Sequence, residues 1–235
     1  MLIKLFRGLA KALCPQRCAY CGKVVSVQSL VCDDCSRVLP RIKGDICKTC
    51  GREKLFCSCK GEKYFVSQAA PFSFEGVVRK GLHIFKFRNG QQNAQAYCLE
   101  MARTVRERYP SVEFDYVIPV PMTEKSIKKR GYNQVEILSE GVAKNLGLEC
   151  LGGNLIKLYE TEKQHGISYL LRKGNLTGVF DVTVPETVRG KTVLLCDDIS
   201  TSGETLNECA KMLWLCGAKE IYCISLALTK QHKKK

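Results

Sequence analysis

The sequence contains no apolar run near the roughly 18 residues that a membrane-spanning helix needs. Its first 15 residues, MLIKLFRGLAKALCP, are not a signal core either, because three cations interrupt the apolar positions and predict an amphipathic helix. Acidic residues are also few, since 23 Asp and Glu stand against 37 Lys and Arg and give a net charge of +14. We therefore expect a cytoplasmic protein without a membrane span, with anionic partners such as nucleic acid or phosphates.

The 15 cysteines are unevenly distributed, with nine of them before residue 60. Without a secretion signal, this distribution favours metal binding in a reducing compartment over disulfides. Three Cys-x2-Cys pairs and one Cys-x-Cys pair can each turn two thiolates toward one ion, and two pairs complete a tetrahedral shell. We interpret them as two successive zinc ribbons that hold one or two structural Zn²⁺ ions. The predicted ligands are Cys18, Cys21, Cys32, Cys35, Cys47, Cys50, Cys57 and Cys59, with Cys14 as a spare.

Strands and helices alternate after residue 63. Strand character is present in residues 64–74, 115–121, 179–184, 191–196 and 220–228. Helical patterns are present in residues 75–87, within 88–109, and in 133–147 and 204–218. Residues 159–178 lack periodicity and are expected to form a long loop. Such alternation predicts an α/β domain with a mostly parallel sheet. We expect an N-terminal helix and double zinc ribbon in residues 1–63, this domain in residues 64–230 and a basic tail in residues 231–235.

The stretch TVLLCDDISTSGETL, residues 192–206, joins a buried apolar strand to two aspartates and a hydroxyl-rich turn. A turn that opens a helix presents backbone N–H groups and the positive helix end to a phosphate. Gly203 allows close backbone approach, and further donors follow on Thr201, Ser202 and Thr205. Asp197 and Asp198 can accept from two adjacent ribose hydroxyls, directly or through Mg²⁺. A capped helix start would explain one acid and one serine, but not two acids.

This stretch resembles the phosphoribosyl-diphosphate (PRPP) motif of type I phosphoribosyltransferases, with Ser202 in place of the second threonine. The resemblance then extends over nearly the whole chain to the ComF family. It rests on the double ribbon and on the segments HIFKFRNG, DYVIPVP, KKRGYNQ and TEKQHGISYLLRKGNLTGVF, which occur in the family's order. It implies a type I phosphoribosyltransferase-like fold, a mostly parallel sheet flanked by helices, preceded by a small zinc-ribbon module.

The resemblance also implies residue roles. The catalytic set would be Asp197, Asp198, Arg130 and Lys163. The set that binds PRPP and its phosphates would be Ser200, Thr201, Ser202, Gly203, Glu204, Thr205, Val120, Pro121, Lys86, Arg88 and Arg172. Residues 161–172 would form a mobile loop that covers the site, and Glu204 is expected to point outward. Ordinary solvation is the alternative for each cation, and Tyr132 could either stack on a base or lie in the core.

Three functions follow from these patterns. We expect a PRPP- and Mg²⁺-binding, phosphoribosyltransferase-like protein that takes part in DNA uptake and handles incoming single-stranded DNA. A helicase-like competence protein is a possible partner, and the sequence does not identify the acceptor. The first alternative is a non-catalytic module that binds single-stranded DNA and uses the pocket as a phosphate site. The second is a regulator that senses PRPP without turnover.

Overall fold

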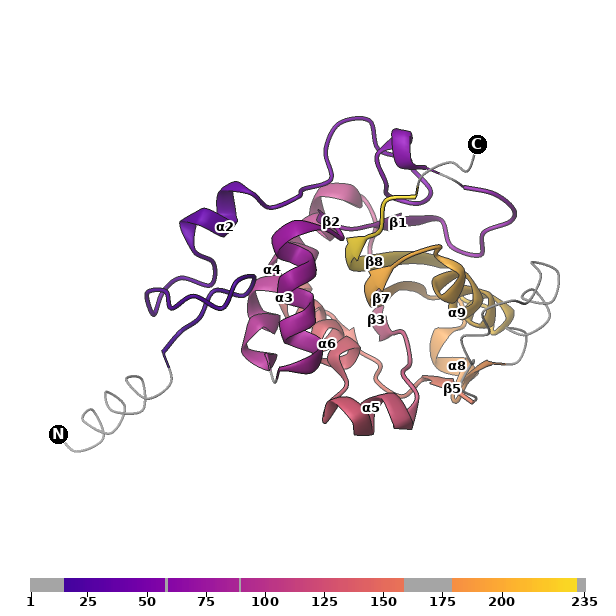
Figure 1. Cartoon of the computed structure of the whole chain (residues 1–235). Helices are drawn as coiled ribbons and strands as arrows, with labels where there is room; N and C mark the ends of the chain where they lie inside the picture. Colours follow the sequence, from indigo (N-terminus) through magenta and orange to yellow (C-terminus); the bar gives the residue numbers. More distant parts are fainter. Residues whose placement is uncertain (1–14, 58, 89, 159–178, 232–235) are drawn as a thin grey trace, which may run out of the picture.

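A six-stranded parallel sheet forms the centre of the molecule, which we describe from a computed structural model covering residues 15–57, 59–88, 90–158 and 179–231 (Figure 1). The strands run in the order β1 (Ser67–Ala69), β8 (Glu220–Leu228), β7 (Thr192–Ser200), β3 (Tyr116–Pro119) and β4 (Glu149–Cys150), and β2 (Phe72–Ser73) also pairs with β8. Every pair in this sheet is parallel. A separate antiparallel pair joins β5 (Leu155–Lys157) to β6 (Phe180–Val182). The predicted parallel α/β architecture is confirmed.

Helices cover both faces of the sheet. Those on one face are α3 (Gly76–Phe87), α4 (Ala94–Arg108) and α6 (Gln134–Leu146), while α9 (Glu204–Leu215) and the short α8 (Pro185–Val188) lie on the other (Figure 1). The remaining short elements are α2 (Asp33–Arg37), α5 (Glu124–Arg130), η1 (Lys54–Phe56) and η2 (Gln91–Asn93). Among the helices in the described ranges, none is long and apolar enough to cross a membrane.

The two faces explain the unbroken apolar run of β7. Leu194 and Cys196 pack into the core beneath α4 and α6, whereas Val193 and Leu195 pack into the core beneath α9. Side chains of a strand alternate between faces, so a strand that is covered on both sides needs apolar residues at every position. On α6, the predicted apolar stripe faces the core, and the helix ends at Gly147 with φ +75°.

The structure differs from the sequence prediction at several places, and the short elements α2, α8, β4 and β5 were not expected. The strand expected at 64–74 is split into β1 and β2 around Pro71, which has no N–H for a strand ladder. Strand β7 does not end at Cys196 but continues to Ser200, because β8 pairs with it along the same length. Helix α5 was not expected, because Ile127 is the one apolar residue in EKSIKKR. The expected N-terminal helix, the long loop at 159–178 and most of the basic tail lie outside the described residues.

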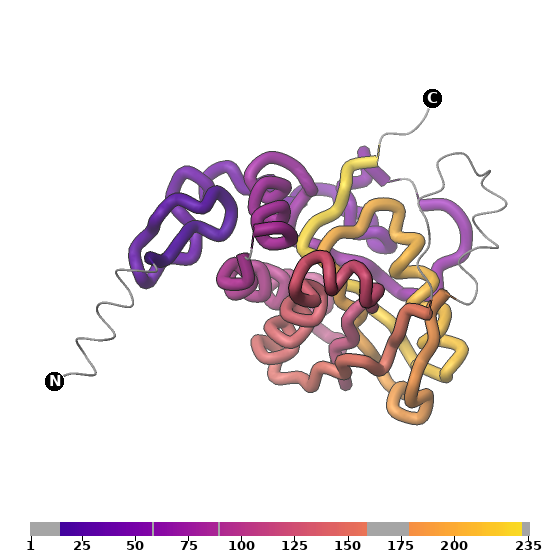
Figure 2. Tube along the Cα trace, turned by 60° about the horizontal axis from the view of Figure 1, so that its bottom comes forward, coloured from indigo at the N-terminus to yellow at the C-terminus, as the bar shows by residue number. Residues whose placement is uncertain are grey.

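Two zinc-ribbon segments pack against different parts of the α/β domain (Figures 1 and 2). In the first ribbon (residues 15–38), the fully buried Tyr20 ring packs against Tyr97 and Phe72, and the Tyr97 hydroxyl donates to the Ala19 carbonyl at 2.6 Å. The second ribbon (residues 45–57 and 59) lies on β1, where the Gln68 N–H donates to the Thr49 carbonyl at 2.8 Å.

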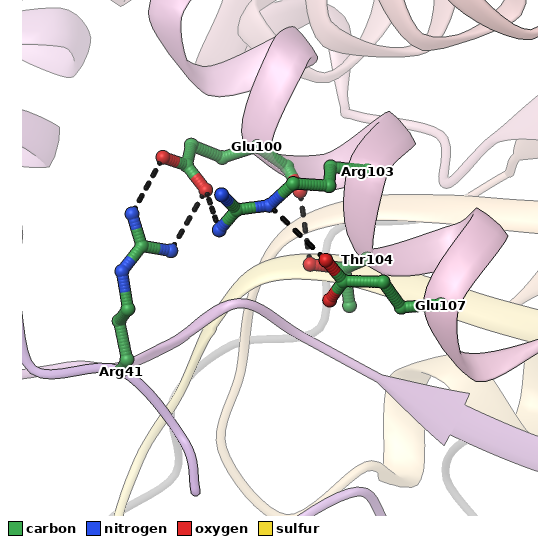
Figure 3. Close-up of polar contacts among 5 residues, drawn as sticks. All are labelled: Arg41, Glu100, Arg103, Thr104 and Glu107. Atoms are coloured by element: carbon green, nitrogen blue, oxygen red, sulfur yellow. Dashed lines mark hydrogen bonds and ion pairs between the residues drawn. The ribbon is translucent and has the colours of Figure 1, made fainter.

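A charged cluster fixes the segment between the ribbons. The Arg41 guanidinium donates two hydrogen bonds to the Glu100 carboxylate of α4, at 2.8 and 2.9 Å (Figure 3). Glu100 also accepts from Arg103 at 2.7 Å, and Arg103 reaches Glu107 one turn further along the helix. A two-point arginine–carboxylate contact restricts orientation as well as distance, so this segment has a defined position on α4.

Candidate functional site

Two clusters of four cysteines lie in the ribbons. In each cluster, the four Sγ atoms lie within 4.8 Å of one another, and the clusters contain all eight predicted ligands. The Sγ–Sγ distance is 3.7 Å for Cys21 and Cys32, and 3.9 Å for Cys47 and Cys59. Four thiolates at about 2.3 Å from a zinc ion in a tetrahedron lie about 3.8 Å apart. Both clusters therefore have the geometry of closed, structural four-thiolate zinc sites. Cys14 lies outside the described residues.

Backbone N–H groups favour the thiolate form in both clusters. Burial alone would raise the pKa of Cys18, but the N–H groups of Cys32, Cys21 and Tyr20 lower it to about 7. In the second cluster, burial raises the pKa of Cys47, but the N–H groups of Cys50 and Thr49 and hydrogen bonds from the Cys57 and Cys50 side chains together lower it to about 7. A hydrogen bond to the charged form stabilises that form, and the thiolate is the form that binds zinc.

The two aspartates lie within the C-terminal half of β7 and have different surroundings. Asp198 is buried, and its Oδ2 accepts from Lys86 Nζ at 2.7 Å and from Gln134 Nε2 at 2.9 Å. Asp197 is partly exposed, and its Oδ1 accepts from the Asp198 N–H at 2.7 Å. Burial and the adjacent Asp198 charge raise the pKa of Asp197 to about 7. Lys86 thus neutralises the Asp198 carboxylate. A cation or a hydrogen-bond donor that binds beside Asp197 would favour the ionised form of that carboxyl.

An open cleft of about 320 Å³ surrounds these carboxylates. Of the predicted site residues, the cleft lining contains Lys86, Val120, Pro121, Arg130, Asp197, Asp198 and Thr205. Val120 and Pro121 follow β3 directly, and the Val120 N–H donates to the Cys196 carbonyl at 2.8 Å, so the loop is fixed beside β7. The cleft lies at the carboxyl ends of β3 and β7, where parallel sheets bind ligands.

The hydroxyl-rich turn connects β7 to α9. Gly203 is the N-cap of this 12-residue helix and has φ +81°, a left-handed conformation that favours glycine. Thr201, Ser202, Glu204 and Thr205 are exposed around it, whereas Ser200 is buried as the last residue of β7. The start of α9 therefore presents its backbone N–H groups at an exposed turn that adjoins the cleft.

Several predicted residues lie elsewhere. Arg88 does not line the cleft, but it lines a neighbouring groove together with Lys86 and Arg130. Tyr132, for which the sequence left two interpretations, packs into the core with its ring 5.9 Å from that of Phe85. Lys163 and Arg172, with the whole predicted loop at 161–172, lie outside the described residues.

Sequence reasoning missed four polar residues of the cleft, namely Thr123, Ser126, Gln134 and Lys157. Gln134 is the last residue of the KKRGYNQ segment, and its buried Oε1 has no hydrogen-bond partner among the described residues. Lys157 is the last residue of β5 and lines the cleft, as Arg130 does. Neither Lys157 nor Arg130 forms an ion pair with a described carboxylate. Gln134 was inside a quoted motif and could have been found there, whereas no local pattern marks Lys157.

Two family models match the chain. The phosphoribosyl transferase domain matches residues 141–235, and the double zinc ribbon domain matches residues 9–67. The first match contains β7, the turn and α9, and the second contains both cysteine clusters. These two matches cover separate parts of the chain, in the order that the sequence analysis expected.

Curated relatives agree with this arrangement. Competence protein ComFC of Streptococcus pneumoniae is 25% identical over 232 residues, which cover 89% of this chain and 99% of the relative. The DNA utilization protein YhgH of Escherichia coli K12 is 25% identical, over 90% of both chains. Competence protein F of Haemophilus influenzae is 35% identical over 112 residues, which span 47% of this chain and only 49% of the relative. The chain belongs to the ComF family, with a type I phosphoribosyltransferase-like domain behind an N-terminal double zinc ribbon.

Proposed function

We propose that the cleft binds PRPP or a closely related phosphorylated sugar together with Mg²⁺. One observation carries this proposal: the paired aspartates of β7, Thr205 in the first turn of α9 and the Val120–Pro121 loop line the same cleft. The turn offers N–H groups to a sugar phosphate, and Asp197 and Asp198 offer acceptors to two ribose hydroxyls. Arg130 and Lys157 supply positive charge for a diphosphate.

The oxygen donors of the cleft suit Mg²⁺. No cation among the described residues pairs with the Asp197 carboxylate, and the buried Gln134 Oε1 lacks a donor. Mg²⁺ prefers oxygen ligands and usually keeps several waters, so it can meet both groups through its waters and the sugar hydroxyls. A divalent ion would also favour the ionised form of Asp197, because an opposite charge lowers the pKa of a carboxyl group.

Phosphoribosyl transfer is the reaction that such a site supports. The bond between C1 of the ribose and the diphosphate oxygen breaks, a nucleophilic atom of the acceptor bonds to C1, and Mg²⁺-diphosphate leaves. The cations beside the cleft would stabilise the charge that develops on the departing diphosphate. A sensor would bind the same ligand without diphosphate release, so turnover separates the two alternatives.

The test is a calorimetric titration of the zinc-loaded full chain with PRPP and Mg²⁺. The Asp197→Asn/Asp198→Asn variant should lose binding, whereas the matched Asp33→Asn/Asp34→Asn variant should bind like the parent. The control likewise removes two negative charges, from the consecutive residues Asp33 and Asp34 at the start of α2. Both of these side chains are exposed. Equal affinity of parent and Asp197/Asp198 variant would refute the proposal. A screen of nucleobases and oligonucleotide ends for diphosphate release then separates an enzyme from a sensor.

A second function, binding of single-stranded DNA, is favoured by the groove next to the cleft. This groove of about 820 Å³ is lined by five cations and no acidic residue, namely Arg79, Lys80, Lys86, Arg88 and Arg130. Phe87 is 55% exposed in the same groove, with its ring 5.1 Å from His83 and 5.7 Å from the Arg130 guanidinium. Cations along a groove follow a phosphate backbone, and an exposed aromatic ring offers a stacking surface to a base.

Fluorescence anisotropy with a labelled oligothymidine tests this function. Phe87→Ala should weaken binding by roughly tenfold, since stacking on one aromatic is worth about 1–3 kcal/mol. Trp214→Ala is the control, because Trp214 is 54% exposed on α9, the helix on the opposite face of the sheet. Arg79→Gln/Lys80→Gln should reduce the slope of log K against log salt by about 1.4. Equal affinity of the Phe87 and Trp214 variants would contradict this use of the groove.

A further inference from the structure

An arginine of the second ribbon crosses to the end of β7. Arg52 lies two residues after Cys50 of the second cluster, yet it is only 4% exposed. Its Nε donates to the Thr229 carbonyl at 2.9 Å, and its Nη2 donates to the carbonyls of Ser200, at 3.3 Å, and Thr201. Ser200 ends β7, and Thr201 begins the turn that leads into α9. A side chain of the zinc module thus holds the first peptide groups of the proposed phosphate turn.

The backbone beside Arg52 is held closely against the sheet. Gly51 has φ +71°, and a Cβ atom at this position would lie 2.3 Å from the Gln68 carbonyl oxygen of β1. The Cys47 N–H donates to the Arg52 carbonyl at 2.7 Å, and the Gly51 N–H donates to the Cys47 carbonyl at 3.0 Å. These bonds close the turn that carries two cysteines of the second cluster. The direction of the Arg52 side chain therefore depends on the backbone that this cluster organises.

Three side chains converge on the Thr201 carbonyl. Besides Arg52, the Thr229 hydroxyl donates to it at 3.3 Å and the Gln231 amide at 2.6 Å. A trans peptide is planar, and its C=O and N–H bonds point in opposite directions. When the Thr201 carbonyl is held toward Arg52, the Ser202 N–H must point to the opposite side. A phosphate bound on that side would accept a hydrogen bond from the Ser202 N–H.

The Arg52 charge also favours an anion at this turn. Within the described ranges, no carboxylate forms an ion pair with its guanidinium, and all of its hydrogen bonds go to backbone carbonyls. A buried charge that lacks a counter-charge is costly. A phosphate at the turn would partly offset this cost, because it brings negative charge close to the guanidinium without displacing its hydrogen bonds.

We propose that Arg52 is a positioning residue for the phosphate turn, and that zinc in the second cluster is required to keep it in place. The inference rests on the proposed sugar-phosphate function and adds to it a metal dependence of the phosphate half of the site. The second cluster is also the more accessible one, since Cys59 is exposed whereas no ligand of the first cluster is. Loss of this zinc releases the turn and weakens binding of the 5-phosphate.

Calorimetry on the zinc-loaded full chain tests the proposal with two ligands. Ribose 5-phosphate probes the turn, and Mg²⁺-pyrophosphate probes the opposite, diphosphate half of the cleft. Arg52→Gln and Cys59→Ser should weaken ribose 5-phosphate binding at least tenfold and change pyrophosphate binding less than twofold. Arg52→Lys, which keeps the charge but loses the fork of donors, should show a smaller loss. The matched control is Arg41→Gln, which removes an arginine of the segment between the ribbons that contacts α4 instead of the turn.

Amide hydrogen exchange gives a readout without ligand. The amides of residues 202–204 should exchange at least tenfold faster in Arg52→Gln and Cys59→Ser than in the parent. Their exchange rates should be unchanged in Arg41→Gln. Zinc content should fall from two ions to one in Cys59→Ser alone. Parent-like exchange and ribose 5-phosphate affinity in folded Arg52→Gln and Cys59→Ser proteins would overturn the inference and leave the proposed function intact. A parent protein that binds neither ligand would refute the proposed function and this inference with it.

Discussion

Replacing Asp197 with asparagine should stabilise the protein, because the fold raises the pKa of this carboxyl from 3.8 to about 7. The folded state then binds the proton more tightly than the unfolded chain does. Below about pH 4 the carboxyl therefore does not change the free energy of unfolding. It lowers this free energy by an increasing amount between about pH 4 and pH 7, and by a constant amount above pH 7. A shift of this size corresponds to at most about 4 kcal/mol. We expect about half of it, since Asp197 keeps some contact with solvent and shares its environment with Asp198.

Urea unfolding of zinc-loaded protein measures the effect. Asp197→Asn should exceed the parent in unfolding free energy by about 2 kcal/mol at pH 8 and by about 1 kcal/mol at pH 5. Asp33→Asn, at an exposed acid, should show no such dependence on pH. An advantage of equal size at both pH values, or a variant less stable than the parent at pH 8, would refute the reasoning. A substitution that raises stability and abolishes PRPP binding is expected at a residue whose role is to bind the ligand.

Three further predictions concern the attachment of the ribbons, and thermal unfolding of the zinc-loaded protein measures each of them. Gly51→Ala should lower stability by about 2–4 kcal/mol, since its Cβ would lie 2.3 Å from the Gln68 carbonyl oxygen; a loss below 1 kcal/mol would contradict the close approach. Tyr20→Ala should cost about 3–5 kcal/mol, whereas Tyr20→Phe should be neutral or stabilising, because the buried hydroxyl has no partner among the described residues; a large loss in the phenylalanine variant would show that the hydroxyl is bonded. Arg41→Ala should cost about 1–3 kcal/mol, because it removes the two-point contact with Glu100 shown in Figure 3; the loss should shrink in 1 M salt, and a salt-independent loss would indicate packing instead.

Local patterns predicted those parts of the fold in which neighbours along the chain determine the structure. The apolar run of β7 and the stripe of α6 follow from burial on two faces and on one face, respectively. Helix α5 was missed because its sequence is almost entirely polar, so its N-cap at Thr123 and its left-handed C-cap at Gly131 were the remaining signals. The end of β7 was misplaced because strand length depends on the partner strand β8, which lies elsewhere in the sequence.

The same division applies to the candidate site. Asp197 and Asp198 were predicted because the chemistry of a sugar-phosphate site is concentrated in one continuous segment. Lys157 and Arg52 were not, because each is an ordinary cation whose role depends on distant segments that the fold brings near it. Arg52 lies 148 residues from Ser200 along the chain. Such contacts have no local periodicity or spacing, and only the three-dimensional arrangement reveals them.

The position of β8 has a consequence for how the protein is made. Among the strands that the structure describes, β8 comes last in sequence, yet it lies between β1 and β7 in the sheet. A ribosome therefore releases both ribbons, β1 and β7 before it releases the strand that joins them, and their edges stay unpaired until then. Thr229, which accepts from Arg52, emerges later still. Nascent chains that stall before β8 contain all eight predicted zinc ligands and both aspartates, but they lack the strand that pairs with β1 and β7 and the Thr229 carbonyl that holds Arg52.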